Sequence, residues 1–392
     1  MKKTTLVLAL ATTVVAANAQ APQFKQVARI DVSAFFTGST VAGNQGGHGS
    51  FIGGITSDGS NIYLSGWSSA GGAQRTGVVK ISNPLSSPST SSFAQRGGVA
   101  GGSRQTKLQW ANNSLYHGYG MGNAGATDNG IQRLDAAGNV LFDVNGAAIT
   151  GLAGTRFDSF HVTNAGIMST TLRFNTDWNS PRSAHLADAT TGLFSSGYTF
   201  APATPGGSNS FRDMVVDGTG QLFTKRGTFT GGIQGWNVSG STISGPVVSS
   251  NIPGTASTNA EEKLGYGDAV NGGGVKYDRY LTSSIQMSTT LAPRSNIQII
   301  SPDGLFGTFN LNGAENGFAQ FGSTAAGFAT NQQTFLNAQS ATINGKRYLL
   351  VAESMAGTAG DYVRIYEAVP EPGTMAALGL GVAAMLRRRK KA

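Results

Sequence analysis

Catalytic and metal-binding side chains usually gather at characteristic spacings, and this chain offers few such groups. Its four histidines, His48, His117, His161 and His185, are far apart and share no metal-ligand spacing. The chain has no cysteine, which excludes thiol chemistry and cysteine metal sites. Asp158 and His161 form one close acid–base pair, but residues three apart on a strand point to opposite faces. We therefore predict neither a catalytic residue nor a metal site.

Two glycine-rich patterns have simpler explanations than ligand binding. The segment 118–122 (GYGMG) superficially matches a phosphate loop, but no helix follows it and no Lys-Ser/Thr pair completes it. Asp-Gly pairs such as Asp58-Gly59 are typical of tight turns and lack the spaced oxygen ligands of a calcium loop. No cofactor is predicted on these grounds, and a structural calcium ion between repeats stays open as an alternative.

Exposed aromatic rings with nearby arginines suit carbohydrate binding, because rings stack on sugars and guanidinium groups bond hydroxyls. In the architecture derived below, such residues fall in loops on one face: Trp67, Arg75, Tyr119, Trp178 and Arg182. Packing of these side chains between repeats is the structural alternative. We favour that alternative, because a buried Trp with a bonded N–H is the commoner state.

Three further arginines, Arg104, Arg156 and Arg212, each lie at the start of a predicted first strand. Three guanidinium groups lining one channel would form an anion site, for example for a uronate carboxylate. Ion pairs with neighbours such as Asp158 and Asp213 are the alternative that we favour.

These residues are positioned by a repeat that is visible in the sequence. Four segments pair a polar turn with a short apolar strand, and the equivalent residues are separated by 53, 53 and 54 positions. They are Ile62, Leu115, Met168 and Leu222, and looser units follow at Leu281 and Leu349. A period of this length with four predicted strands per unit is typical of a β-propeller blade.

We therefore predict an all-β propeller of about six blades (six to seven), since a lone four-stranded sheet cannot bury both of its faces. The strand at 27–32 would complete the last blade and close the ring. A parallel β-helix, which prefers shorter repeats, and a pair of β-sandwiches, which would not give equal spacing, are the alternative architectures.

The N-terminus has the three parts of a secretory signal peptide. Lys2 and Lys3 precede an apolar stretch, which ends in the small residues Ala17 and Ala19 around Asn18. We expect export by the Sec machinery and cleavage between Ala19 and Gln20.

The C-terminus also carries an ordered pattern of three parts. Pro370, Glu371 and Pro372 form a turn that neither a helix nor a strand can continue through. An apolar run at 373–386 follows, which is shorter than the roughly 20 residues of a comfortable membrane span. Five cations at 387–391 come last and would keep that end cytoplasmic. The order predicts a weak membrane anchor, with a short transmembrane helix, behind an accessible turn.

This tail closely resembles the PEP-CTERM sorting signal of Gram-negative bacteria. The resemblance covers only the last two dozen or so residues, with Pro370, Glu371 and Pro372 as the motif. It implies recognition by an exosortase, a membrane protease, after transient insertion in the inner membrane. It also implies a destination in the cell envelope, at the cell surface or in the extracellular matrix. An ordinary tail anchor that is never cut is the alternative.

The charge of the chain points away from nucleic acid. The whole chain has 28 Lys and Arg against 20 Asp and Glu, but seven of the cations and one of the anions lie in the two terminal signals. The remaining body has 21 cations against 19 anions, so its net charge is about +2. Nonspecific binding to polyanions therefore loses its main support.

Together these patterns predict a signal peptide at 1–19, a propeller at 20–368 and a sorting signal at 369–392. We expect an exported, non-catalytic binding or structural module, associated with extracellular polysaccharide. A secreted polysaccharide-degrading enzyme, a lyase or glycosidase on the same scaffold, is the alternative, and a receptor for a protein partner would use the same loops.

Overall fold

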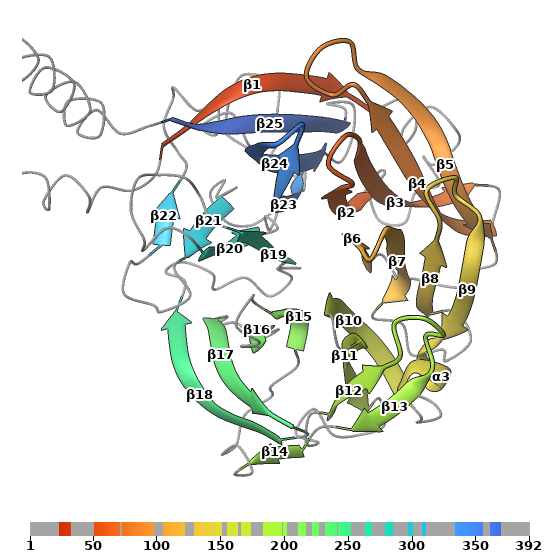
Figure 1. Cartoon of the computed structure of the whole chain (residues 1–392), viewed down its shortest axis with the longest axis vertical. Coiled ribbons are helices and arrows are strands. Elements are labelled where there is room, and N and C mark those ends of the chain that lie inside the picture. The colour runs from red at the N-terminus through yellow and green to blue at the C-terminus, as the bar shows by residue number, and fades with distance from the viewer. Residues whose placement is uncertain are drawn as a thin grey trace, which may run out of the picture.

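The computed structural model describes the strands of the predicted propeller and the turns between many of them. The described residues are 23–32, 51–70, 73–97, 105–121, 129–150, 155–163, 166–173, 183–197, 199–201, 211–216, 222–226, 232–240, 242–251, 263–268, 279–284, 297–300, 308–310, 334–355 and 361–369. Within these ranges the strands form six sheets, arranged as blades around a central axis (Figure 1). The predicted all-β propeller of about six blades is confirmed.

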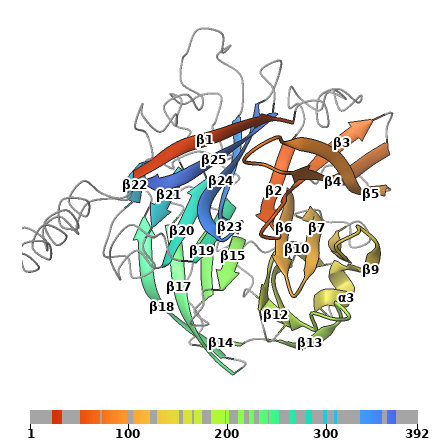
Figure 2. The same ribbon diagram turned by 45° about the horizontal axis from the view of Figure 1, so that its top comes forward.

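Each blade begins with a strand near the axis and continues outwards through antiparallel neighbours (Figures 1 and 2). Blade 1 contains β2 (Phe51–Ser57), β3 (Ile62–Ala70), β4 (Ala73–Ser82) and β5 (Ser89–Gly97). Blade 2 contains β6 (Gln105–Ala111), β7 (Ser114–Met121), β8 (Gly130–Leu134) and β9 (Val140–Asn145). Blade 3 contains β10 (Thr155–Thr163), β11 (Gly166–Arg173), β12 (Ser183–Ala187) and β13 (Phe194–Gly197).

The second half of the ring follows the same plan. Blade 4 contains β15 (Phe211–Val216), β16 (Leu222–Arg226), β17 (Gly232–Ser239) and β18 (Thr242–Asn251). Blade 5 contains β19 (Lys263–Asp268), β20 (Arg279–Ser284), β21 (Ile297–Ile300) and β22 (Thr308–Asn310). Blade 6 contains β23 (Thr334–Ile343), β24 (Lys346–Met355), β25 (Asp361–Val369) and the N-terminal strand β1 (Gln23–Asp31).

The two ends of the described chain close the ring. Strand β1 pairs antiparallel with β25, from Gln23 opposite Val369 to Asp31 opposite Tyr362. Arg29 lies over the Tyr362 ring at 3.8 Å, and Arg364 donates to the Gln26 side chain at 3.1 Å. The predicted closing role of the N-terminal strand is therefore confirmed.

Apolar side chains of alternate strand positions meet between neighbouring sheets and form the core. One cluster joins blade 1 to blade 6 and includes Ile55, Leu64, Leu350 and Ile365. A second cluster spans blades 2 and 3 around Tyr116 and Phe160. Burial between the sheets stabilises the ring, because a single sheet of four strands leaves one face in water.

The chain passes from blade 3 to blade 4 within a few residues. The stretch 193–200 is divided between β13, which pairs with β12, and the short strand β14 (Thr199–Ala201). Strand β14 leaves blade 3 and pairs in parallel with β18 of blade 4. Strand-forming residue types record how well a segment fits a pleated sheet but not which sheet it joins.

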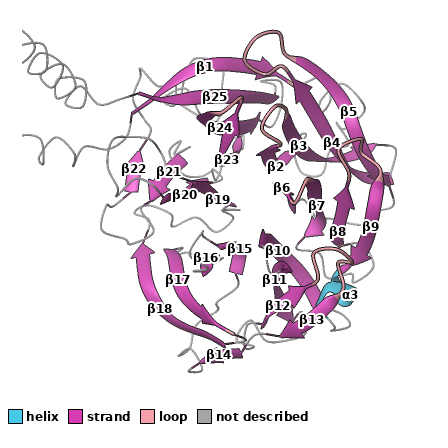
Figure 3. Ribbon diagram, in the orientation of Figure 1, coloured by secondary structure: helices cyan, strands magenta, loops and turns pink. Residues whose placement is uncertain are grey.

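Helical structure is rare among the described residues (Figure 3). The helix α3 (Gly146–Thr150) follows β9, and the Asn145 side chain accepts from the Ala148 amide at 2.9 Å, as a helix cap does. No helix in the described ranges is long and apolar enough to cross a membrane. The predicted signal peptide at 1–19 and the predicted membrane segment of the tail lie outside the described residues.

Candidate functional site

The inner strands of four consecutive blades share one irregularity. The register of each shifts at an equivalent position, between residues 52 and 54, 105 and 107, 157 and 159, and 211 and 213. Such β-bulges turn the following side chains to a new direction and are common beside functional sites. The residues directly after the shifts are Gly54, Lys107, Ser159 and Asp213. These positions define the candidate site, on the inner strands that face the axis (Figure 1).

Lys107 is the central residue of this site. Its side chain is only 8% exposed, and its Nζ donates to Ser159 Oγ at 3.1 Å and to the Met214 carbonyl oxygen at 2.6 Å. The Met214 amide donates to the same Ser159 oxygen at 3.3 Å. The ammonium group also lies 5.9 Å from the centre of the Phe160 ring. One lysine of blade 2 thus connects the inner strands of blades 3 and 4.

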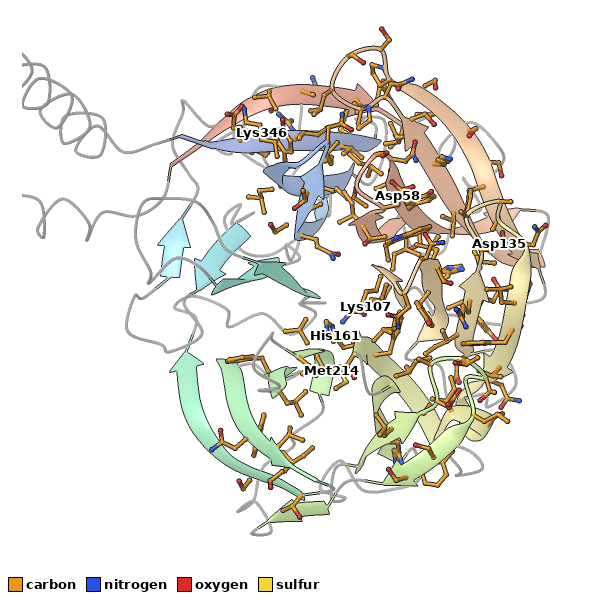
Figure 4. The ribbon with its side chains drawn as sticks, in the orientation of Figure 1. Asp58, Lys107, Asp135, His161, Met214 and Lys346 are labelled. Atoms are coloured by element: carbon orange, nitrogen blue, oxygen red, sulfur yellow. The ribbon has the colours of Figure 1, made fainter. Side chains whose placement is uncertain are left out.

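His161 lies on the same inner strand as Ser159, two residues further on, and is half-buried. Figure 4 shows Lys107, His161 and Met214 close together beside the axis. This group combines an ammonium group and an imidazole with a hydroxyl, which can donate or accept a hydrogen bond, and a carbonyl oxygen, which accepts. In its contacts with Ser159 and Met214, Lys107 acts as a hydrogen-bond donor between blades.

A second set of contacts joins neighbouring blades at the repeat period. The Gln109 side chain donates to the Val162 carbonyl at 3.0 Å and accepts from the Val162 amide at 2.7 Å, across 53 residues of sequence. Thr56 occupies the equivalent place in blade 1, and its hydroxyl accepts from the Trp110 amide at 3.0 Å. Side chains of one inner strand therefore satisfy backbone groups of the next.

The carboxylate of Asp58 serves a turn. It accepts from the amides of Ser60 and Asn61, from the Asn61 side chain and from the Tyr63 hydroxyl, all within 2.8 Å. Burial raises the pKa of Asp58, but these hydrogen bonds outweigh it and hold the pKa below its ordinary value of 3.8. Burial, with the bond to Asp58, raises the pKa of Tyr63 far above its ordinary range.

Three other carboxylates also have structural partners. Asp135 and Asp188 lie in the turns before β9 and β13 and accept from amides of those turns. The bonds from Asn139 to Asp135 and from the Thr191 amide to Asp188 are the main causes that lower the pKa of each carboxyl. Glu367 of β25 pairs with Lys346 of β24 at 2.5 Å.

The structure corrects the predicted loop positions of three candidate ligand residues. Trp67 lies in β3, Arg75 in β4 and Tyr119 in β7, because the strands continue through the Gly, Ser and Thr residues that had suggested loops. The Tyr119 ring is fully buried, and its hydroxyl donates to Asp143 at 2.6 Å, so it offers no exposed surface for a sugar. Trp178 and Arg182 lie outside the described residues.

The predicted arginine group is described in part. Arg156 lies near the start of β10, and Arg212 is the residue skipped by the register shift of β15, so both belong to inner strands. Arg104 lies outside the described residues, directly before β6. An anion site formed by the three stays a prediction.

The histidines are not brought together as one site. His117 is buried on β7, and His185 is buried on β12 with its ring at 5.7 Å from Phe194. Burial lowers the pKa of His185. Within the described ranges, no group of three or more His, Asp and Glu residues is suited to hold a metal ion. His48 lies outside those ranges.

Sequence reasoning missed Lys107, whose partners lie in two other blades. The available signal was a single cation in the predicted inner strand 106–110, where the preceding repeat has Gly54. Interpreting it required knowledge of which inner strands are neighbours.

Comparison with known proteins identifies the tail. Residues 368–390 match the model of the PEP-CTERM protein-sorting motif, which includes Pro370, Glu371 and Pro372. The motif is the substrate signal for exosortase processing and indicates an exported protein sorted to the cell envelope or surface of a Gram-negative bacterium. Ala19, Gln20 and the three motif residues lie outside the described structure. No curated protein matches the chain.

Solved structures resemble the body. An α-L-arabinanase of Penicillium chrysogenum in complex with arabinobiose is 10% identical, with a TM-score of 0.51 over 89% of this chain and 99% of the other. An α-L-arabinanase of Cellvibrio cellulosa is 11% identical, with a TM-score of 0.36 over 67% of this chain and 94% of the other. Regucalcin, a calcium-binding protein of Agrobacterium tumefaciens, is 14% identical, with a TM-score of 0.33 over 60% and 81%. At 10% identity, the likeness to the first establishes the fold alone.

Proposed function

We propose that this chain is a sorted propeller that acts at the cell surface or in the extracellular matrix as a non-catalytic binding or structural module, associated with extracellular polysaccharide. One observation carries the proposal. The matched sorting motif starts at residue 368, inside the strand β25 that closes the ring and ends at Val369. The sorting signal is thus continuous with a folded body, which the signal delivers as one unit.

The contacts of the candidate site support a structural or binding role. Lys107 is occupied with Ser159 and Met214, which lie in different blades. Asp58 and Asp135 bond the backbone of their own turns. Acid–base catalysis on sugars needs two carboxylates roughly 5–10 Å apart, one of which donates a proton. These carboxylates instead stabilise turns.

A polysaccharide-degrading enzyme is the second candidate. It is favoured by the fold shared with the Penicillium arabinanase, a protein solved with a bound sugar. An enzyme of this kind would place its carboxylates outside the contacts described above. The same propeller scaffold supports both readings, since function depends on the residues of the site rather than on the fold.

The sorting part is tested in the native host. We would compare wild type with Glu371→Ala by cell fractionation and intact mass, with Glu367→Ala as the matched control. Glu367 is an acidic residue at the end of β25 that pairs with the exposed Lys346, and the loss of a surface ion pair changes stability little. We expect wild type and control to lose the tail and leave the inner membrane, while Glu371→Ala keeps Ala392 and stays there. Retention of Ala392 in all three proteins would show a plain anchor.

The binding part is tested with the mature protein and the extracellular polysaccharide of the same host. We expect the protein to sediment with the polymer and the polymer to keep its length. New reducing or unsaturated chain ends that grow with time would establish the enzyme instead. If the protein neither binds nor cleaves the polysaccharide, the proposed association with polysaccharide is refuted.

A further inference from the structure

The start of the sorting motif is held in the propeller by one strand. The described pairing of β24 with β25 ends where Tyr348 lies opposite Glu367. Strand β1 pairs further along β25, with Phe24 opposite Ala368 and Gln23 opposite Val369. Among the described strands, β1 alone therefore pairs with the first two residues of the matched motif, 368 and 369.

Processing enzymes that cleave a peptide chain bind the residues around the scissile bond in an extended form with free backbone groups. A residue paired within a sheet is available only after local opening, which costs free energy. Ala368 and Val369 are therefore withheld from the enzyme as long as β1 is paired. Loss of residues within β25 would also remove the strand that closes the ring.

We propose that β1 sets the boundary of processing, so that the chain is cut in the tail beyond Val369 and β25 stays whole. Hydrolysis there breaks one peptide bond: the acyl carbon takes the oxygen of water, and the nitrogen of the departing tail takes a proton. The strand that guards this boundary lies shortly after the expected signal-peptide cleavage site, between Ala19 and Gln20. Correct placement of the N-terminus thereby decides where the C-terminus is made.

The variant Phe24→Pro tests the proposal, because proline removes a backbone donor and restricts φ at the position opposite Ala368. Phe24→Val is the matched control, since valine keeps the donor and favours a strand. The inference rests on processing at the motif, which is part of the proposed function. The first measurement is therefore independent of processing: hydrogen exchange of the amides at 368 and 369 in proteins that also carry Glu371→Ala and keep the tail.

Successive amides of a strand point to opposite sides, so one of these two faces β1. We expect that amide to exchange on the order of 10-fold faster, or more, in Phe24→Pro than in Phe24→Val. Equal exchange in both would overturn the shielding role of β1, whether or not the tail is processed. If Phe24→Pro does not fold, the Glu371→Ala protein with an unchanged Phe24 still tests the proposal. Fast exchange of both amides, at 368 and at 369, in that protein would refute the pairing with β1.

The second measurement is the intact mass of processed protein from the host. We expect wild type to end beyond Val369, and Phe24→Pro to include forms that end at Val369 or earlier. A wild-type C-terminus within β25 would refute the boundary. If no protein is processed but exchange is still faster in Phe24→Pro than in Phe24→Val, the proposed sorting is refuted. The protection of residues 368 and 369 by β1 is then still supported.

Discussion

The hydrogen bonds between neighbouring inner strands predict how much two substitutions, Gln109→Leu and Thr56→Val, lower the stability of the fold relative to each other. Gln109 of blade 2 makes two hydrogen bonds to the backbone of Val162, and Thr56 of blade 1 makes one to the Trp110 amide. Gln109→Leu and Thr56→Val keep much of the side-chain volume but remove these bonds. The two variants therefore differ mainly in how many backbone groups of the next blade lose a partner.

The structure sets the size of each effect. A buried backbone group without a partner costs about 1–3 kcal/mol, and the lower part of that range, about 1–2 kcal/mol per group, applies to these part-buried contacts. Gln109→Leu leaves two such groups at Val162, which is only 4% exposed, and we expect a loss of about 2–4 kcal/mol. Thr56→Val leaves one group and is expected to cost about 1–2 kcal/mol. The exposed Ser91→Ala of β5 serves as the background and is expected to stay within about 0.5 kcal/mol of wild type.

The assay is urea unfolding of the processed protein, followed by tryptophan fluorescence and circular dichroism. Coincident transitions with unchanged slopes allow the midpoints to be compared as free energies. If Gln109→Leu costs no more than Thr56→Val, the two bonds to Val162 do not act as a pair. If both match Ser91→Ala, contacts between inner strands contribute nothing measurable, and the reasoning is refuted.

Two further predictions concern turns. Gly138 has a φ of 90°, and a Cβ there would lie 2.7 Å from the Phe93 carbonyl oxygen of the preceding blade, so Gly138→Ala should cost about 2–4 kcal/mol. Gly240 is the control, because it has a φ of 57° and a Cβ added there would have no described atom within 4 Å. Gly240→Ala should cost about 1 kcal/mol. Equal melting temperatures for the two variants would exclude the clash with Phe93. Tyr63→Phe removes a bond to Asp58, whose pKa lies below 3.8 in the fold, and a lowered carboxyl pKa stabilises only above the unfolded value. We expect a loss of about 1–2 kcal/mol at pH 7 that shrinks as the pH falls through the folded pKa of Asp58. A loss that stays the same down to a pH at which Asp58 is protonated in the folded protein would contradict this role.

The repeat and the closing strand could be predicted because they depend on local patterns. Polar turns such as the one at Asp58 recur before short apolar strands, and the Asp58 carboxylate accepts from amides of its own turn. The tail motif is likewise local, since its three parts follow one another directly. Signals of this kind require no knowledge of which strands are neighbours.

The candidate site could not be predicted, because it depends on contacts between blades. The two hydrogen bonds of Lys107 span 52 and 107 residues of sequence, and no local pattern distinguishes this lysine from one on a solvated strand. The register shifts before Gly54 and Lys107 are invisible in residue types, although they decide which side chains face the axis. The glycines on both sides of Tyr119 favour a loop in the sequence, whereas the structure places this residue in the strand β7.

The closure by β1 has a consequence for the order in which the protein is made. With the signal peptide that we expect at 1–19, β1 would cross the membrane first and its partner β25 last, so blade 6 would be completed only after almost the whole chain has crossed. Until then β1 is an edge without a partner, the kind of segment that aggregates. Its sequence suits the delay, since the exposed Arg29 and Asp31 place charges along the strand, which discourages pairing between chains. Export in this order would keep the ring open until β25, which directly precedes the sorting tail, has crossed.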